Sequence, residues 1–253
     1  MPKLYHLIFC AIGILFTSQS YSGEKVNYYV IANQAQPFQI EHNGKQHSGI
    51  VSDIVAEIFT DSRYDLVYHT YPFNRMISIL EAGGEENWIT YGSPKWGKVQ
   101  SENLSDLPIY TVRHTLVTSQ VAPFRYQDIS SLESKGMVLL LGFDYPELMP
   151  YIKQGKMDEI RVKDYQAAFR ILKRQPEDTA FVEMESRVKY HLGRLNLPQY
   201  DYRIDGFSDV IPDYPIHLAF SSSIDPVIQQ FINRRLAEMA ENGTLEKIVN
   251  RYI

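Results

Sequence analysis

The sequence predicts an α/β protein in which short strands alternate with helices, many of ten residues or more. Three observations carry this prediction: β-rich runs bounded by turn residues, apolar residues spaced three or four apart between those runs, and capping residues at the start of the periodic segments. Alternation of this kind is typical of sheets covered by helices. The chain has no internal repeat and no low-complexity segment.

The first half of the chain is expected to hold three strands and two helices. Residues 26–32 (VNYYVIA) form the longest β-rich run, and 66–69 and 88–91 are shorter ones. Residues 50–59 place four isoleucine and valine side chains and a phenylalanine on one helical face. A second helix is expected after Asn74, with its end at two consecutive glycines.

The second half repeats the alternation. Asp164 is expected to cap a helix, and Asp225 followed by a proline is expected to cap a longer one that ends at an Asn-Gly pair. The remaining elements are strands at 112–118, 137–141, 179–183 and 216–221, and helices at 146–154, 186–195 and 244–252.

The first 22 residues have the order of a secretory signal peptide. Lys3 precedes an uninterrupted apolar run at 7–16, and small residues follow, with Ser20 and Ser22 placed as at a signal-peptidase site. Ten residues rise about 15 Å as a helix, roughly half of a bilayer core, which makes the run a poor permanent anchor. We therefore expect cleavage near Ser22 and export to the periplasm.

Cysteine usage restricts the chemistry further. Cys10 is the only cysteine and lies inside the apolar run, so the exported chain is expected to have no disulfide, no thiolate metal site and no thiol nucleophile. Phe9 stands where a lipoprotein site needs a small residue, which argues against lipidation.

Charge and motifs exclude several other classes. With 25 Lys and Arg against 30 Asp and Glu, the chain is mildly acidic and has no basic stripe, so no nucleic-acid partner is expected. The seven histidines form no His-x-x-x-His pair, and no phosphate or dinucleotide loop is present. We predict no metal and no cofactor.

Several short motifs follow one another along the chain in a recognisable order. They are Pro37–Phe38, Gly49-x-x-x-Asp53, 71–75 (YPFNR), 107–110 (LPIY), 131–142, 178–183 (DTAFVE) and 231–252. This order resembles family 3 of the bacterial extracellular solute-binding proteins, which is typified by periplasmic binders of polar amino acids, and the resemblance covers nearly all of the exported chain. It implies two α/β lobes of the type II binding-protein kind, lobe one at 24–111 plus 217–253 and lobe two at 112–216, with the ligand in the cleft between them.

One departure from the family bears on the ligand. Members that bind amino acids have a Thr-Pro-Glu-Arg-like segment whose Arg grips the ligand carboxylate, and here Trp96 occupies that place after Ser93, Pro94 and Lys95. Glu183 stands where the family has its ammonium-binding acid, and Arg75 is a candidate for a cationic contact. A site that keeps the family's anionic group at Glu183 and has Trp96 in place of the arginine favours a cationic or aromatic ligand.

The resemblance, together with the place of Phe143 and Tyr145 just before an expected helix N-terminus, gives a set of candidate ligand residues, each with a plainer alternative. The aromatic candidates are equally compatible with core packing or loop cover, Arg75 with a surface ion pair, and Glu183 with a solvated acid at the end of a strand. The candidates are Phe38, Phe73, Arg75, Tyr91, Ser93, Trp96, Phe143, Tyr145 and Glu183.

Three functions are compatible with these features. The first is a periplasmic solute-binding protein, expected to be a monomer, that delivers a small polar solute to an ABC transporter in the membrane. The second is a periplasmic enzyme resembling cyclohexadienyl dehydratase, with Glu183 as the candidate general acid. The third is a receptor whose ligand-bound form docks on a membrane signalling partner.

Overall fold

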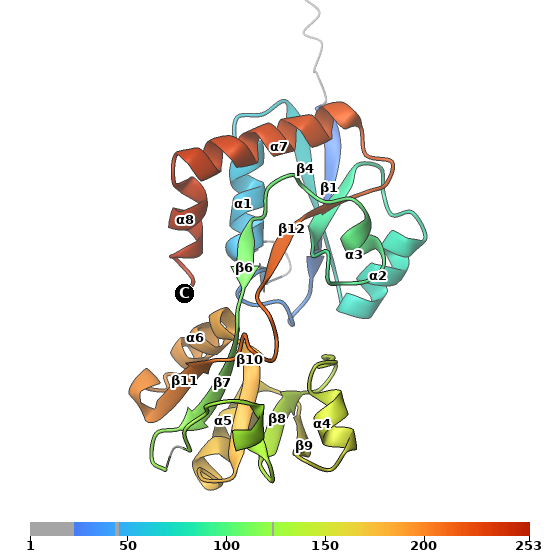
Figure 1. The fold of residues 1–253 in the computed structure, drawn as a ribbon. Helices are drawn as coiled ribbons and strands as arrows, with labels where there is room; N and C mark the ends of the chain where they lie inside the picture. Colours follow the sequence, from blue (N-terminus) through green and yellow to red (C-terminus); the bar gives the residue numbers. More distant parts are fainter. Residues whose placement is uncertain (1–22, 44–45, 123) are drawn as a thin grey trace, which may run out of the picture.

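The chain folds into two lobes, each built on a five-stranded sheet with helices packed on it (Figure 1). The computed structural model describes residues 23–43, 46–122 and 124–253. The predicted two-lobed α/β architecture is confirmed, whereas the predicted signal peptide lies outside the described residues. Within these ranges, no helix combines the length and the apolar character needed to cross a membrane.

The first lobe contains the sheet with strand order β4-β1-β5-β12-β6. Strand β1 runs parallel to β4 and β5, and β12 runs antiparallel to β5 and β6. The strands are β1 (Glu24–Ile31), β4 (Tyr64–Tyr71), β5 (Trp88–Gly92), β6 (Tyr110–Val112) and β12 (Tyr214–Phe220). The other elements are the hairpin β2 (Ile40–His42) and β3 (Gln46–Ser48), and helices α1 (Ile50–Phe59), α2 (Phe73–Glu81), α3 (Val99–Glu102), α7 (Pro226–Glu241) and α8 (Thr244–Val249).

The second lobe contains the sheet with strand order β11-β7-β10-β8-β9. Strand β10 is parallel to β8 and antiparallel to β7. The strands are β7 (His114–Ser119), β8 (Gly136–Leu140), β9 (Asp158–Val162), β10 (Thr179–Met184) and β11 (Tyr202–Gly206). The helices are α4 (Met149–Lys153), α5 (Tyr165–Arg174) and α6 (Glu185–Arg194), with 3-10 turns at Ile129–Leu132 and Gln199–Asp201.

Two predicted helix caps are confirmed. The Asp164 carboxylate accepts a hydrogen bond of 2.8 Å from the Ala167 amide at the start of α5, and Asp225 accepts one of 2.7 Å from Val227 at the start of α7. Helix α7 also has the expected proline in its first turn. These bonds satisfy amides that a helix N-terminus would otherwise leave free.

Three sequence predictions were wrong in detail. The single strand predicted at 112–118 is two strands, because the chain leaves the first sheet after β6 and enters the second at β7. The helix predicted at 146–154 shrinks to the five residues of α4, and α2 begins right after Pro72, one position before Asn74.

Four strands were not predicted at all: β2 and β3 of the hairpin, and β9 and β11 of the second sheet. Strands β9 and β11 are polar and lie at the two edges of the second sheet. An edge strand buries less of each side chain than a central strand, so its sequence carries a weaker hydrophobic pattern.

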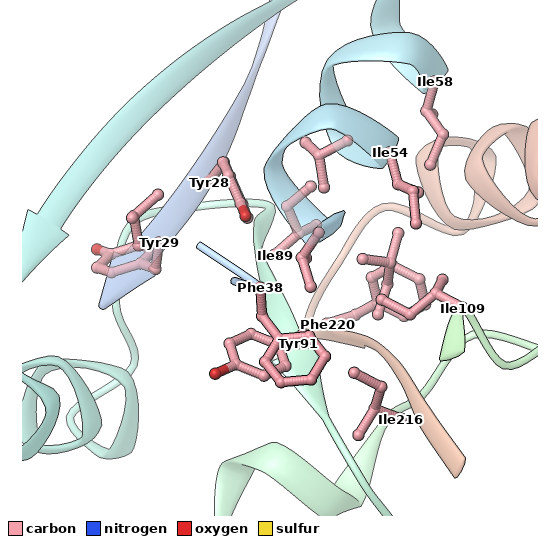
Figure 2. Close-up of a cluster of buried hydrophobic side chains, with 14 of the residues drawn as sticks. Tyr28, Tyr29, Phe38, Ile54, Ile58, Ile89, Tyr91, Ile109, Ile216 and Phe220 are labelled. Atoms are coloured by element: carbon pink, nitrogen blue, oxygen red, sulfur yellow. The ribbon is translucent and has the colours of Figure 1, made fainter. Parts of the chain in front are cut away.

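The core of the first lobe extends to the second. Figure 2 shows Phe38 and Tyr91 lying side by side at one end of this cluster, away from Ile58, and their ring centroids are 6.1 Å apart. Met184, the last residue of β10 in the second lobe, belongs to the same buried cluster. The two lobes are therefore in contact where Phe38 and Tyr91 lie.

Residues near the C-terminus are tied to the start of α1. The Tyr252 hydroxyl donates to Asp53 at 2.8 Å and accepts from the Gly49 amide at 2.8 Å. Gly49 has a φ of 107°, and a Cβ there would lie 2.7 Å from the Phe38 carbonyl oxygen, so only glycine fits this approach without strain. Helices α7 and α8 thus pack on α1 in the first lobe.

We predict that Gly92→Ala destabilises the protein by about 1–3 kcal/mol, because overpacking forces the backbone apart. A Cβ at Gly92 would lie 1.9 Å from the Gln100 carbonyl oxygen, which accepts the Ser93 amide at 3.0 Å. Gly97→Ala is the matched control, since a Cβ there meets nothing within 4 Å. Urea unfolding of both variants measures the difference, and equal stabilities would contradict the prediction.

Candidate functional site

The candidate site lies where strand ends of the two sheets approach each other. Strand β5 ends in the loop that carries Trp96, β8 leads to Phe143, and β10 leads directly into α6. The side chain of Arg187 on α6 meets rings of both lobes, with its Cζ 5.9 Å from the centroid of Phe38 and 5.0 Å from that of Phe143. Carboxyl ends of strands are the usual ligand edge of α/β sheets.

We call seven residues here the junction cluster. They come from both lobes, and each contacts or electrostatically affects at least one other member. They are Phe38, Tyr91 and Trp96 of the first lobe, and Phe143, Tyr165, Glu183 and Arg187 of the second.

Glu183 is a buried carboxylate with two hydrogen bonds of its own. Only 3% of the residue is exposed, at the end of β10. Its Oε2 accepts from the Tyr165 hydroxyl at 3.0 Å, and its Oε1 accepts from the Met184 amide at 2.8 Å. Burial raises the pKa of Glu183, while Arg187 and the two hydrogen bonds act in the opposite direction. His191 stacks on Tyr165 at a centroid distance of 3.5 Å and so fixes the donor ring.

Arg187 is a buried guanidinium in the first turn of α6, and 5% of it is exposed. Burial works against its charge, but the phenols of Tyr165 and Tyr91 and the carboxylate of Glu183 outweigh that effect and raise its pKa. Its Nε has no hydrogen-bond partner within 23–43, 46–122 and 124–253. Among the residues that the structure describes, no carboxylate oxygen lies within 4.0 Å of the guanidinium nitrogens.

The first lobe supplies aromatic rings to this junction. Tyr91 meets Trp96 edge to face at 5.4 Å, and Trp96 meets Tyr214 at 6.4 Å in the same manner. Burial raises the pKa of Tyr91 to about 12, partly offset by Arg187, so the phenol stays neutral at physiological pH. Buried Ser93 holds the Trp96 loop in place, because its Oγ donates to the Pro215 carbonyl at 2.8 Å and accepts from the Lys95 amide at 3.3 Å.

The second lobe supplies Phe143 and Tyr145 on a loop that Arg161 fixes. Nη1 of Arg161 donates to the carbonyl oxygens of Leu140 at 2.9 Å and Phe143 at 2.7 Å. The Tyr145 hydroxyl accepts from the Leu140 amide at 3.2 Å. Burial, with the negative charge of Glu183 as the next cause, raises the pKa of Tyr145.

His114 is a further buried polar group near Arg187. Its ring lies 5.9 Å from that of Tyr214, and its Nδ1 has no hydrogen-bond partner. The pKa of His114 is lowered to about 4, mainly by burial and secondly by the positive charge of Arg187. The imidazole is therefore neutral at pH 7.

The structure places the predicted ligand residues in three groups. Phe38, Tyr91, Trp96, Phe143 and Glu183 belong to the junction cluster, and the negative charge of Glu183 acts on Tyr145. Ser93 holds the loop that carries Trp96 through its two hydrogen bonds. The last two are outside the cluster: Phe73 is 38% exposed, and exposed Arg75 stacks on Tyr71 with its Cζ 5.3 Å from the ring centroid. Their role in binding stays a prediction.

Sequence reasoning missed Arg187, Tyr165 and His114. A usable signal for Arg187 is its distance of four residues from Glu183, because β10 passes into α6 without a loop between them. Tyr165 directly follows the cap of α5, and His114 directly follows the crossing between the sheets. Within the described ranges, no group of three or more His, Cys, Asp or Glu side chains is arranged to hold a metal ion.

We predict that acid destabilises the protein through His114. A histidine whose pKa is about 4 in the folded state and near 6.5 in the unfolded state stabilises the fold above pH 6.5, and this contribution is lost as the pH falls towards 4. Between pH 7 and pH 4, the parent should lose about 3 kcal/mol more unfolding free energy than His114→Gln. Urea unfolding at several pH values measures this, and identical pH slopes would rule it out.

Known structures share this fold. A Streptococcus mutans structure from work on glutathione import via GshT and the cystine ABC importer TcyBC is 20% identical, with a TM-score of 0.69, covering 91% of this chain and 95% of that one. An ancestral cationic amino acid solute-binding protein is 15% identical, with a TM-score of 0.68, covering 90% and 95%. The substrate-binding protein of an amino acid ABC transporter is 18% identical, with a TM-score of 0.64, covering 90% and 99%.

At these identities the structures establish the fold alone, and no curated protein matches the chain. The sequence model of the bacterial extracellular solute-binding proteins, family 3, matches residues 29–253, which are nearly all of the described chain. Because this match spans both lobes, the chain belongs to family 3 of the bacterial extracellular solute-binding proteins.

Proposed function

We propose that this protein captures a small polar solute between its two lobes and presents it to an ABC transporter in the membrane. The observation that carries the proposal is the junction cluster, where a buried guanidinium with an unpartnered Nε lies between rings of opposite lobes. Buried polar groups in folded proteins are nearly always paired, so an unpaired one between two lobes favours a ligand that completes it.

The proposed binding event requires the lobes to separate and close. The lobe limits that we propose are 24–111 with 217–253 for one lobe and 112–216 for the other. They are supported by the strand pairing, which joins β12 to β5 and β6 in one sheet and β7 to β10 and β11 in the other. Only the passages β6 to β7 and β11 to β12 connect the two sheets, which suits a hinge.

The proposed partners follow from the family. Membership among extracellular solute-binding proteins supports a small-molecule ligand, a membrane transporter and an exported protein. We further propose cleavage near Ser22 and a periplasmic location. Two of the similar structures are described as substrate-binding proteins or domains of amino acid ABC transporters. We propose that the protein acts as a monomer.

A second candidate is an enzyme that dehydrates a cyclic acid. One observation favours it: burial raises the pKa of Glu183, as a general acid requires. Incubation with cyclohexadienyl acids, followed by NMR, separates the candidates, because the binding proposal expects no product.

We predict that a thermal-shift screen of the exported form finds a stabilising solute among amino acids, polyamines, small amides and aromatic acids. A ligand at 100 times its dissociation constant stabilises the folded state by about 2.7 kcal/mol. For a chain of this length, each kcal/mol raises the melting temperature by about 2–4 °C. Isothermal titration calorimetry then gives the dissociation constant.

A matched pair of variants makes the screen specific to the junction. Trp96→Ala removes a ring of the junction cluster and should weaken binding at least tenfold, whereas Tyr200→Ala removes a ring that is 80% exposed and should not. Equal affinities of these two variants would argue against binding at the junction. A complete absence of stabilising compounds would refute the proposed function.

A further inference from the structure

We infer that Arg187 is the anion receptor of this site and that the solute carries a carboxylate, which the guanidinium grips from the second lobe. This inference rests on the proposed function and adds the chemical class of the ligand. The first lobe, where Trp96 stands after Ser93-Pro-Lys, has no arginine in the junction cluster.

Arg187 is a buried cation with no carboxylate in contact with it in the described part of the chain. A buried cation is normally paired with an anion, because removing it from water costs several kcal/mol. Across the described residues, Arg187 has no carboxylate within 4.0 Å, and its close polar neighbours are the neutral phenols of Tyr91 and Tyr165. The guanidinium therefore has no carboxylate in direct contact, and Glu183 acts on its charge only from beyond 4.0 Å.

Glu183 does not pair directly with Arg187, because its oxygens lie more than 4.0 Å from the guanidinium nitrogens. Each of its two oxygens already accepts a hydrogen bond, from Tyr165 and from the Met184 amide, and these bonds hold the carboxylate beside β10. Glu183 favours the positive charge of Arg187 from a distance without forming a salt bridge. This arrangement also argues against the cationic ligand expected from the sequence, because the negative charge of Glu183 already interacts with the positive charge of Arg187.

The Nε–H of Arg187 is a donor that a ligand can use. The rings of Phe38 and Phe143 contact the guanidinium from opposite lobes, and its Nε remains without a partner. Arginine binds carboxylates through paired N–H donors in a planar fork, of which Nε–H is one. A carboxylate at Nε would complete the hydrogen bonding and the charge of Arg187 together.

Nearby polar atoms suit the rest of such a solute. The unpartnered Nδ1 of neutral His114 is near Arg187 and can donate or accept a hydrogen bond. The rings of Tyr91 and Trp96 offer apolar faces from the first lobe. A carboxylate attached to a compact apolar or aromatic body matches these surroundings.

Arg187 has one alternative role, which is structural: it would act as a latch that joins the two lobes through its contact with Phe38. A latch would change the affinity for every solute equally, whatever its charge. An anion receptor changes the affinity for carboxylates and leaves that for neutral isosteres almost unaltered. The charge dependence of binding therefore distinguishes the two.

The test compares matched carboxylates and amides on the full exported chain. The probes are benzoate with benzamide, L-phenylalanine with L-phenylalaninamide, L-arginine with L-argininamide and L-glutamate with L-glutamine, screened by thermal shift and titrated by calorimetry. We expect the binding carboxylate to bind at least tenfold more tightly than its amide, because truncating a buried charge contact is costly. Arg187→Gln should remove this preference, Arg187→Lys should keep part of it, and Arg194→Gln, at an exposed site on the same helix, should leave it unchanged.

Each outcome decides the question. An amide that binds as tightly as its carboxylate, or an Arg187→Gln variant that keeps the carboxylate preference, overturns the inference and leaves the proposed function standing. Stabilisation by none of these probes and by nothing in the wider screen overturns both. Circular dichroism of Arg187→Gln checks its fold, and Arg187→Lys provides the decisive comparison if that variant is unfolded.

Discussion

The burial of two opposite charges at the lobe junction is the constraint on which the rest of the site depends. Glu183 and Arg187 are both at least 95% buried, yet they form no salt bridge within 4.0 Å. Each charge has its own surroundings: a phenol and an amide for the carboxylate, and two phenols and two phenyl rings for the guanidinium. Since some of these groups come from the first lobe, the electrostatics of Arg187 depend on how the lobes are placed.

Tyrosine is the residue that makes this arrangement possible. Burial raises the pKa of Tyr91, Tyr145 and Tyr165, so these phenols remain neutral hydrogen-bonding groups beside charged ones. A phenol offers both an apolar face and a polar tip, which suits a region that must pack when the lobes meet and still bind a polar solute. Three of the 18 tyrosines of the chain, Tyr91, Tyr145 and Tyr165, have this role.

The residues that form the family fold are largely distinct from the few residues that decide the ligand chemistry. The two-lobed scaffold is shared with structures at 14–20% identity, so it tolerates almost complete replacement of the sequence. The charged residues at the junction are set by a few positions at strand ends and at the first turn of α6. Scaffold similarity consequently says little about the solute, which depends on those few side chains.

The sequence by itself determined the fold class, the main helices and their caps at Asp164 and Asp225, because these features rest on local periodicity and local hydrogen bonds. It also singled out Phe38, Tyr91, Trp96, Phe143 and Glu183, which the structure brings to one junction. Only the tertiary structure decided that the run 112–118 divides between two sheets, that Arg75 lies outside the junction and that Arg187 lies within it. Those outcomes depend on the packing of segments far apart in the chain, and a local pattern carries no information about such contacts.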